Sequence, residues 1–237
     1  MATTLEAKKS TTGRVTADTA RVDRLKAQMM NTPQQIDSER VRIMAEVYEG
    51  TAGYQQIIRR AKFFAEVIER KRLYIDENLI VGSMASSVNA VYTYPEWNVQ
   101  WMKDENTVEK SKTPEDRKAN QWALEYWDKW ALRPRADEIF IKKFGFDPDP
   151  VYQAGLIAEF MSWPGGGGNL NYPRVYRNGL SSIIKEVEER QKALDMRLPN
   201  ASKFYFYEAC LITMRAVIRL AHRYAELARE MAAKEKD

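Results

Sequence analysis

Cys210 and His222 are the only thiol and the only imidazole of this 237-residue chain, so they are the first candidates for nucleophilic catalysis. A cysteine nucleophile needs a base within hydrogen-bonding reach. Apolar periodicity predicts one helix over residues 201–234, where a rise of about 1.5 Å per residue separates the two side chains by about 18 Å along the axis. This separation excludes a cysteine–histidine pair. We expect Cys210 to pack in an apolar seam and His222 to pair with a carboxylate or face solvent.

The same two counts exclude a zinc finger, a Cys/His metal cluster and an intrachain disulfide. Residues 163–169 (Trp-Pro-Gly-Gly-Gly-Gly-Asn) offer backbone N–H groups of the kind that bind phosphate. They lack the lysine and the hydroxyl residue of a P-loop, and a helix is expected before them, so we exclude that motif. Two interpretations stay open: a flexible connection, or a substrate-facing loop with Phe160 and Trp163 as its apolar wall.

Several aromatic residues could form a stacking platform or a ligand cage, but their helical spacing indicates core or interface positions instead. They are Trp97, Trp101, Trp122, Tyr126, Trp127 and Trp130. The neighbouring acids Glu188 and Glu189 are typical of a solvated helix face, and Asp147 and Asp149 are typical of a turn.

The formal charge of +4 is concentrated at the start of the chain, where residues 1–30 hold six basic and three acidic side chains. A nucleic-acid-binding protein places its basic residues on a folded face, so nucleic-acid binding is not expected. No apolar run approaches the roughly 18 residues of a membrane span, and the polar N-terminus lacks the apolar segment of a signal peptide. We therefore expect a cytoplasmic protein that binds neither membrane nor nucleic acid.

The elements that position these residues are mostly helical. Asp37 is expected to cap one helix and Thr113, followed by Pro114, to cap another. A single short, buried strand is expected around Leu79-Ile80-Val81. The predicted helices are 15–30, 38–50, 54–71, a short one at Tyr94–Trp97, one from 114 through Trp130, Val151–Trp163, 179–194 and 201–234.

The last predicted helix carries two apolar seams that lie one position apart, one through Tyr207, Leu211 and Met214 and one through Cys210 and Val217. Together they form an apolar arc wider than a surface helix presents, so this helix is expected to be surrounded. It reaches the end of the sequence without a capping glycine. We interpret the chain as truncated.

Five segments, in order, resemble the N-terminal part of glycyl radical enzymes of the pyruvate formate-lyase type. Ile36–Tyr48 is similar to the family's ID-x-ER-x-R helix, and Ile58–Lys62 is similar to its IRRA segment. Tyr74–Gly82 is similar to DxELIVG, and Tyr94–Glu96 is similar to [FY]PE. Ala216–Ala228 is similar to the segment that combines AV-I with RYA. The resemblance covers roughly residues 20–235.

The resemblance implies the N-terminal helical part of a ten-stranded β/α barrel: mainly α, with one or two short strands. Residues 1–30 are expected to form a basic, mobile tail and a first helix, and 31–237 the helical portion of the pyruvate formate-lyase-type domain. In the family, a C-terminal glycyl radical oxidises an active-site cysteine. Neither element is in this chain: Arg174–Arg177 lacks the glycine of the glycyl loop, and Cys210 matches a structural position. No catalytic residue is therefore assigned.

The family also implies partners, a cofactor and a pocket. An S-adenosylmethionine iron–sulfur activating enzyme installs the protein radical, so no cofactor is expected on this chain itself. The expected partners are that enzyme, a C-terminal remainder or second subunit, and a second copy in a homodimer.

Phe160 matches a pocket-lining phenylalanine of the family, and Gly168 stands where diol and hydroxyproline dehydratases have a histidine. Together with Trp163 and Asn169, the glycine at position 168 resembles the pattern of arylacetate decarboxylases. The sequence thus predicts part of an anaerobic radical lyase that cleaves C–C, C–O or C–N bonds, including decarboxylation of an aromatic acid, and that is catalytically incomplete alone. A stand-alone helical interaction or scaffold protein is the alternative.

Overall fold

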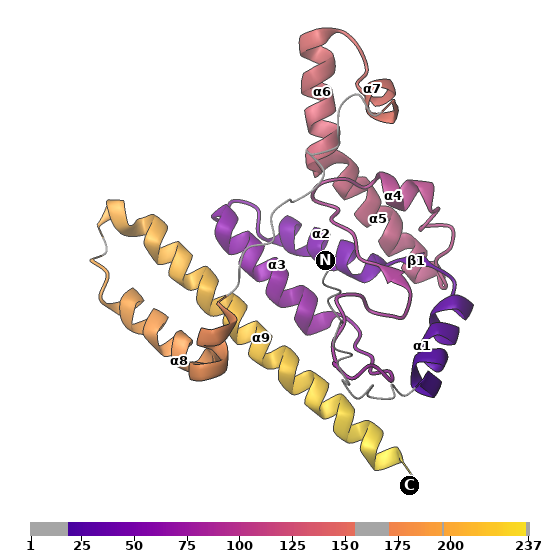
Figure 1. Cartoon of the computed structure of the whole chain (residues 1–237). Helices are drawn as coiled ribbons and strands as arrows, with labels where there is room; N and C mark the ends of the chain where they lie inside the picture. Colours follow the sequence, from indigo (N-terminus) through magenta and orange to yellow (C-terminus); the bar gives the residue numbers. More distant parts are fainter. Residues whose placement is uncertain (1–18, 155–170, 196, 236–237) are drawn as a thin grey trace, which may run out of the picture.

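The computed structural model describes residues 19–154, 171–195 and 197–235, and this part of the chain is mainly helical (Figure 1). The mainly α fold with a pair of short strands confirms the expected fold class. The elements in order are α1 (Thr19–Asn31), β1 (Gln35–Ile36), α2 (Ser38–Gly50), α3 (Gln56–Arg70), β2 (Ala90–Val91), α4 (Gln100–Asp104), α5 (Pro114–Trp130), α6 (Leu132–Phe144), α7 (Asp149–Gln153), α8 (Tyr172–Lys192), a 3-10 turn (Leu198–Asn200) and α9 (Ala201–Lys234).

Both predicted helix caps form. The Asp37 carboxylate accepts a hydrogen bond from the Glu39 N–H at 3.1 Å at the start of α2. The Thr113 hydroxyl accepts one from the Asp116 N–H at 3.0 Å, and Pro114 occupies the first turn of α5. Each cap satisfies one of the N–H groups that a helix start leaves without a partner.

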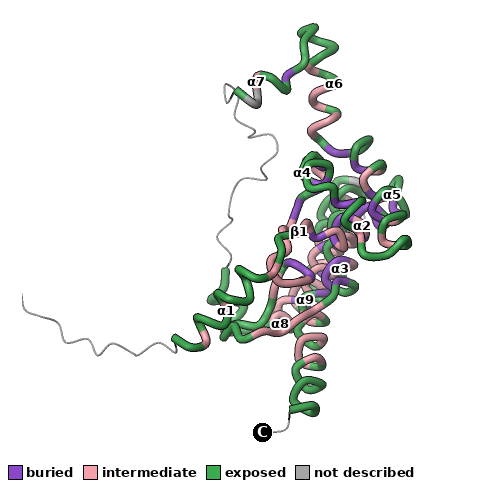
Figure 2. Tube along the Cα trace, turned by 90° about the vertical axis from the view of Figure 1, so that its right-hand side faces the viewer, coloured by how far each residue is buried: buried purple, intermediate pink, exposed green. Residues whose placement is uncertain are grey.

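The core lies where α2, α4 and α5 meet, beside Phe63 of α3, and buried residues concentrate there (Figure 2). Trp127 of α5 is 2% exposed, and its indole N–H donates to the Val41 carbonyl of α2 at 3.1 Å. Tyr48 packs against the same indole, with ring centroids 5.7 Å apart. This cluster fixes α5 against α2.

The long helix α9 lies along α3: Ala209 clusters with Ile58 and Ala61 of α3, and Ala216 clusters with Ala65 and Ile68. Helix α8 contacts α9 from another side and kinks at Gly179, whose φ is 71°. The C-terminal turns of α9 extend beyond the other helices (Figure 1). Only Ala209, Leu211 and Ala216 of its 34 residues are buried, so the described chain covers α9 on part of its circumference.

The predicted strand around Leu79-Ile80-Val81 is wrong. These residues form no strand, and their side chains are 82%, 86% and 51% exposed. Strand structure needs a neighbouring backbone, and the described chain places none beside this segment. The two strands that do form, β1 and β2, pair in parallel with Gln35 opposite Ala90.

Other boundaries also differ from the predictions. Tyr94–Trp97 is a turn rather than a helix, in which the Trp97 N–H donates to the Tyr94 carbonyl at 2.9 Å. Helix α7 covers only the start of the predicted helix 151–163, whose continuation lies outside the described residues. Helix α8 has an unpredicted first part from Tyr172, where Asn171 caps it and Pro173 favours the first turn. The non-helical Gly179 separates this part from the continuation to Lys192, which matches the helix predicted over 179–194.

Helix α6 was not predicted as a separate element. It projects from the end of α5 and has no buried residue (Figures 1 and 2). In the described part of the chain, no helix is long and apolar enough to cross a membrane.

Candidate functional site

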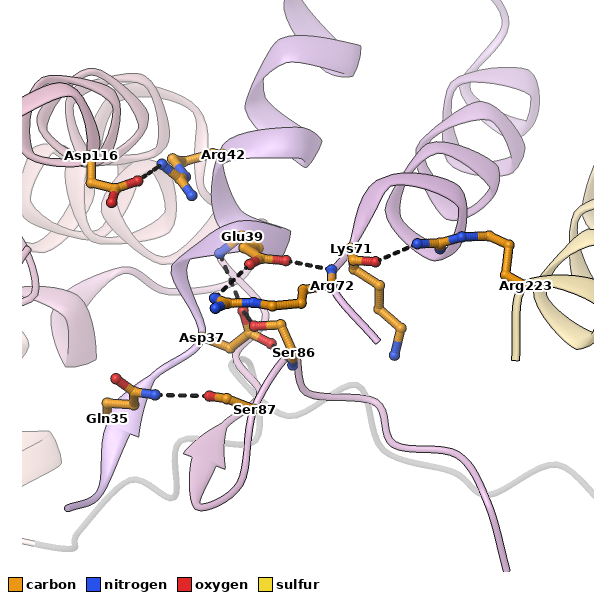
Figure 3. Close-up of polar contacts among 10 residues, drawn as sticks. All are labelled: Gln35, Asp37, Glu39, Arg42, Lys71, Arg72, Ser86, Ser87, Asp116 and Arg223. Carbon is orange, nitrogen blue, oxygen red and sulfur yellow. Dashed lines mark hydrogen bonds and ion pairs between the residues drawn. The ribbon is translucent and has the colours of Figure 1, made fainter. Parts of the chain in front are cut away.

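The four residues predicted to line a substrate pocket, Phe160, Trp163, Gly168 and Asn169, lie outside the described residues. The polar site that the structure does describe is the junction where the family motifs meet. It joins the start of α2, the end of α3, the 83–87 loop and α9 (Figure 3).

Asp37 is the centre of this motif junction. Its side chain also accepts hydrogen bonds from the Ser86 N–H at 2.7 Å and the Ser86 hydroxyl at 2.9 Å, and the residue is only 4% exposed. One carboxylate thus caps α2 and holds a loop 49 residues further along the chain. With this set of donors, Asp37 acts as a structural anchor.

Arg223 of α9 closes the end of α3. Its guanidinium donates to the Ile68 carbonyl at 2.5 Å and to the Lys71 carbonyl at 2.8 Å. The last carbonyls of a helix have no partner within the helix, so this arginine supplies what a local cap would otherwise supply. The arginine of the RYA motif therefore joins two helices that are far apart in sequence.

Lys71 and Tyr224 hold the 83–87 loop, which follows α3 along the chain. The Lys71 ammonium donates to the Ser83 carbonyl and, at 3.3 Å, to the Met84 carbonyl. Burial lowers the pKa of Lys71 below its ordinary value, against the opposing effect of Asp37. The Ser83 N–H donates to the Tyr224 hydroxyl at 3.1 Å.

A polar cavity of about 140 Å³ opens beside the junction. Glu39 accepts from the Arg72 N–H at 2.8 Å and from its guanidinium at 3.0 Å. Arg42 donates to Asp116 at 2.7 Å, and this hydrogen bond lowers the pKa of that carboxyl. These carboxylates are already paired with cations, and no cluster of three metal-ligating side chains occurs among the described residues. The cavity therefore lacks an evident base or metal site.

Arg40 is the motif residue whose role could not be read from the sequence. It is 3% exposed and donates to the Thr93 carbonyl at 2.7 Å and to Glu96 at 3.3 Å. Its guanidinium also lies 4.6 Å from the ring centroid of Tyr92 and 5.0 Å from that of Tyr94. The sequence signal for this contact is the arginine of the first family motif together with the Y-P-E motif far along the chain. The two motifs identify Arg40 and Glu96 as a pair, but they do not give the geometry of the contact.

Cys210 and His222, the two candidates for nucleophilic catalysis, lie on α9 as the sequence predicts. Cys210 is half-buried on α9, and burial raises the pKa of its thiol, which disfavours the reactive thiolate. His222 is exposed to solvent on the same helix.

Among the aromatics, Trp127 is core as predicted. Trp101 and Trp130 are 51% and 48% exposed, so their role at an interface stays a prediction.

Comparison with known proteins shows which family and which solved structures this chain resembles. A family model described as pyruvate formate lyase-like matches residues 11–237. Trans-4-hydroxy-L-proline dehydratase of Clostridioides difficile is 32% identical over 228 residues, covering 92% of this chain and 28% of the relative. (2S)-3-sulfopropanediol dehydratase of Klebsiella oxytoca is 28% identical over 233 residues, with the same coverage. A glycyl radical enzyme from Archaeoglobus fulgidus superposes with a TM-score of 0.74 at 25% identity, covering 92% of this chain and 29% of that one.

The fold and the junction define a class: the helical N-terminal part of a glycyl radical enzyme. More particularly, the chain belongs to the pyruvate formate lyase-like family. It spans about 28% of the length of the curated relatives named here.

Proposed function

We propose that this chain supplies the N-terminal helical part of a radical lyase and is catalytically incomplete alone. The observation that carries the proposal is the family match over residues 11–237 combined with coverage of only 28% of the relatives' length. The described site supports a scaffold role, because the motif residues hold helices and loops together and their carboxylates are already paired.

The proposal covers the domain to which this chain belongs and the partners of the complete enzyme. Residues 31–237 form one piece of the domain, preceded by a basic tail with the first helix. The remaining polypeptide brings the radical glycine and the active-site cysteine, and a radical S-adenosylmethionine enzyme installs the radical. The complete enzyme works in the cytoplasm as a homodimer.

Within this class, the substrate proposal rests on residues 160–169. In the sequence, Phe160 and Trp163 are the apolar residues expected to face the substrate, and Gly168, followed by Asn169, stands where the dehydratase pattern has a histidine. We propose a carboxylate with an aromatic or apolar body as the substrate and decarboxylation as the reaction. The competing substrates are those in the relatives' names, trans-4-hydroxy-L-proline and (2S)-3-sulfopropanediol.

Anaerobic reconstitution tests the proposed function. The chain is incubated alone, and separately with the part of the C. difficile dehydratase that it does not cover, each with an activating enzyme and S-adenosylmethionine. Arylacetates and the two named substrates are offered in turn. We expect no turnover by the chain alone and a stable complex with the remainder. Turnover by the chain alone, or failure to associate, contradicts the proposal.

The alternative of a stand-alone interaction protein is tested on the chain by itself. The exposed apolar residues predict that an environment-sensitive apolar dye binds the isolated chain and is displaced when the remainder associates. A monomer that unfolds cooperatively and binds no dye favours the stand-alone reading.

A further inference from the structure

Four of the six tryptophans of the chain line a single groove, which we call the aromatic groove. It lies between the end of α2, the start of α3, the turn at 94–97 and the junction of α5 with α6, and its volume is about 890 Å³. This volume is within the range of sites that hold a drug-sized molecule. Its aromatic residues are Tyr48, Trp97, Trp122, Tyr126, Trp127 and Trp130.

The walls of the aromatic groove are fixed by tertiary contacts. At the start of α6, the Arg133 N–H donates to the Trp97 carbonyl at 2.9 Å. The buried Trp127 ring contacts Tyr48, with centroids 5.7 Å apart, and Tyr126, with centroids 5.2 Å apart. A groove held in this way is formed before a ligand arrives, so binding does not have to order its walls first.

The aromatic groove offers hydrogen-bond donors that lack acceptors. In the described part of the chain, Trp127 is the only one of the four tryptophans whose indole N–H has an acceptor, the Val41 carbonyl. Trp97 and Trp122 are half-buried, and Trp130 is 48% exposed. Because an indole N–H can only donate, a ligand that suits these three residues supplies acceptor atoms.

The charged residues of the groove favour the same kind of ligand. Lys129 and Arg135 lie over the Trp130 ring, 5.1 Å and 5.5 Å from its centroid, and neither has a carboxylate partner among the described residues. Glu96 is already held by Arg40 at 3.3 Å. An anionic group can therefore pair with cations beside a ring on which a planar body stacks. The charged lining residues are Arg59, Arg60, Lys129 and Arg135 against Glu49, Glu96 and Glu125.

We propose that the aromatic groove binds a planar aromatic anion, a ring system that carries a carboxylate or a phosphate. The ring stacks on Trp130, the anionic group pairs with Lys129 and Arg135, and the unpaired indole N–H groups donate to its oxygen atoms. The inference goes beyond the proposed function and does not depend on it, because every residue that it uses lies in this chain.

Titration of the whole chain with two aromatic anions tests the proposal. The probes are naphthoate, an aryl carboxylate, and adenosine monophosphate, a nucleotide. Binding is followed by NMR through the indole N–H resonances, which single tryptophan-to-phenylalanine variants assign, and calorimetry gives the Kd. We expect the resonances of Trp97, Trp122 and Trp130 to shift and that of Trp101, which does not line the groove, to stay in place. Naphthylmethylamine, which has the same ring and the opposite charge, should bind at least about tenfold more weakly than naphthoate.

Matched variants locate the contact. Trp130→Ala and Arg135→Met should each weaken binding of the anion at least about fivefold, because they remove the stacking ring and one cation. The controls lie outside the groove: Trp101→Ala at an indole that is 51% exposed, and Lys118→Met at an exposed cation of α5. Both controls should leave the Kd within about twofold. Thermal melting checks that each variant folds.

The possible results separate support from refutation. Binding of one anion but not the other supports the proposal and identifies the source of the ligand. Equal binding of naphthoate and naphthylmethylamine overturns it, and so does the absence of indole shifts with both anions. Indole shifts that appear only when the uncovered part of the C. difficile dehydratase is added also overturn it, because they assign the groove to a protein contact.

Discussion

Helices α2 and α9 differ in how far this chain encloses them. Six of the 13 residues of α2 are buried, against three of the 34 residues of α9. Helix α2 lies between α3 and α5, while α9 is covered by α3 and α8 and leaves Phe206 and Val217 exposed. The difference teaches that the described chain completes one core internally, around α2, and leaves apolar side chains of α9 exposed.

Removing Trp127 is the strongest test of the enclosed region. Trp127→Ala empties the space between α2 and α5 and leaves the Val41 carbonyl without its indole donor. We expect a loss of about 4 kcal/mol in the free energy of unfolding, measured by urea denaturation. Trp130→Ala, at a half-exposed indole, should cost less than about 1 kcal/mol. Equal losses for the two variants would mean that the buried indole and the half-exposed indole contribute equally to stability, which contradicts the comparison.

Arg40 gives the next largest effect. Arg40→Met leaves Glu96 and the Thr93 carbonyl without their donor, so we expect about 3 kcal/mol of destabilisation in the same assay. The control is Arg72→Met, whose side chain is 66% exposed in its pair with Glu39 and should contribute less than about 1 kcal/mol. A small loss at Arg40 would mean that the motif pair does not hold the α2 region together.

The tyrosines near α2 predict a weaker, pH-dependent effect. Burial raises the pKa of Tyr92, and likewise the pKa values of Tyr48 and Tyr126, above the ordinary tyrosine value. The folded state thus favours the neutral phenol, so this stabilisation is present below about pH 10 and is lost as pH rises through the raised pKa. Urea denaturation across that range should show the decline, and Tyr92→Phe should flatten it. A pH-independent curve for the unmodified chain would contradict this reasoning.

The exposed face of α9 predicts the smallest change. Phe206→Ser and Val217→Ser should alter the stability of the isolated chain by less than about 0.5 kcal/mol, since both side chains already contact water. In the reconstituted complex the same substitutions should weaken association, read by size-exclusion chromatography. A large loss of stability in the isolated chain would show that α9 is already enclosed.

Local signals were sufficient for much of the fold. Asp37 and Thr113-Pro114 predicted their helix starts because a cap is decided within a few residues, and apolar periodicity predicted α9 over its full length. The strand at Leu79–Val81 failed because its side chains match a buried strand, whereas the described chain leaves them exposed and places no backbone beside them. The pairing of Gln35 with Ala90 escaped prediction because two-residue strands carry no periodic pattern.

The site was less predictable than the fold. Sequence motifs identified Arg40, Glu96 and Arg223 as family markers, but only tertiary structure shows which carbonyls and carboxylates they contact. Those contacts span 53 to 155 positions of sequence, beyond the reach of any local pattern. The predicted pocket residues 160–169 stay a prediction. Gly168→His tests them in the reconstituted enzyme, where it should shift preference from arylacetates toward hydroxylated substrates.

The pairing of α3 with α9 also sets an order of events during synthesis. The bidentate contact between Arg219 and Glu69 joins residues 150 positions apart. At about 5 to 20 residues per second, a ribosome needs roughly 8 to 30 s to make that interval. Throughout it, the apolar face of α3 has no α9 to cover it, so α3 can reach its final packing only after the whole interval has been made.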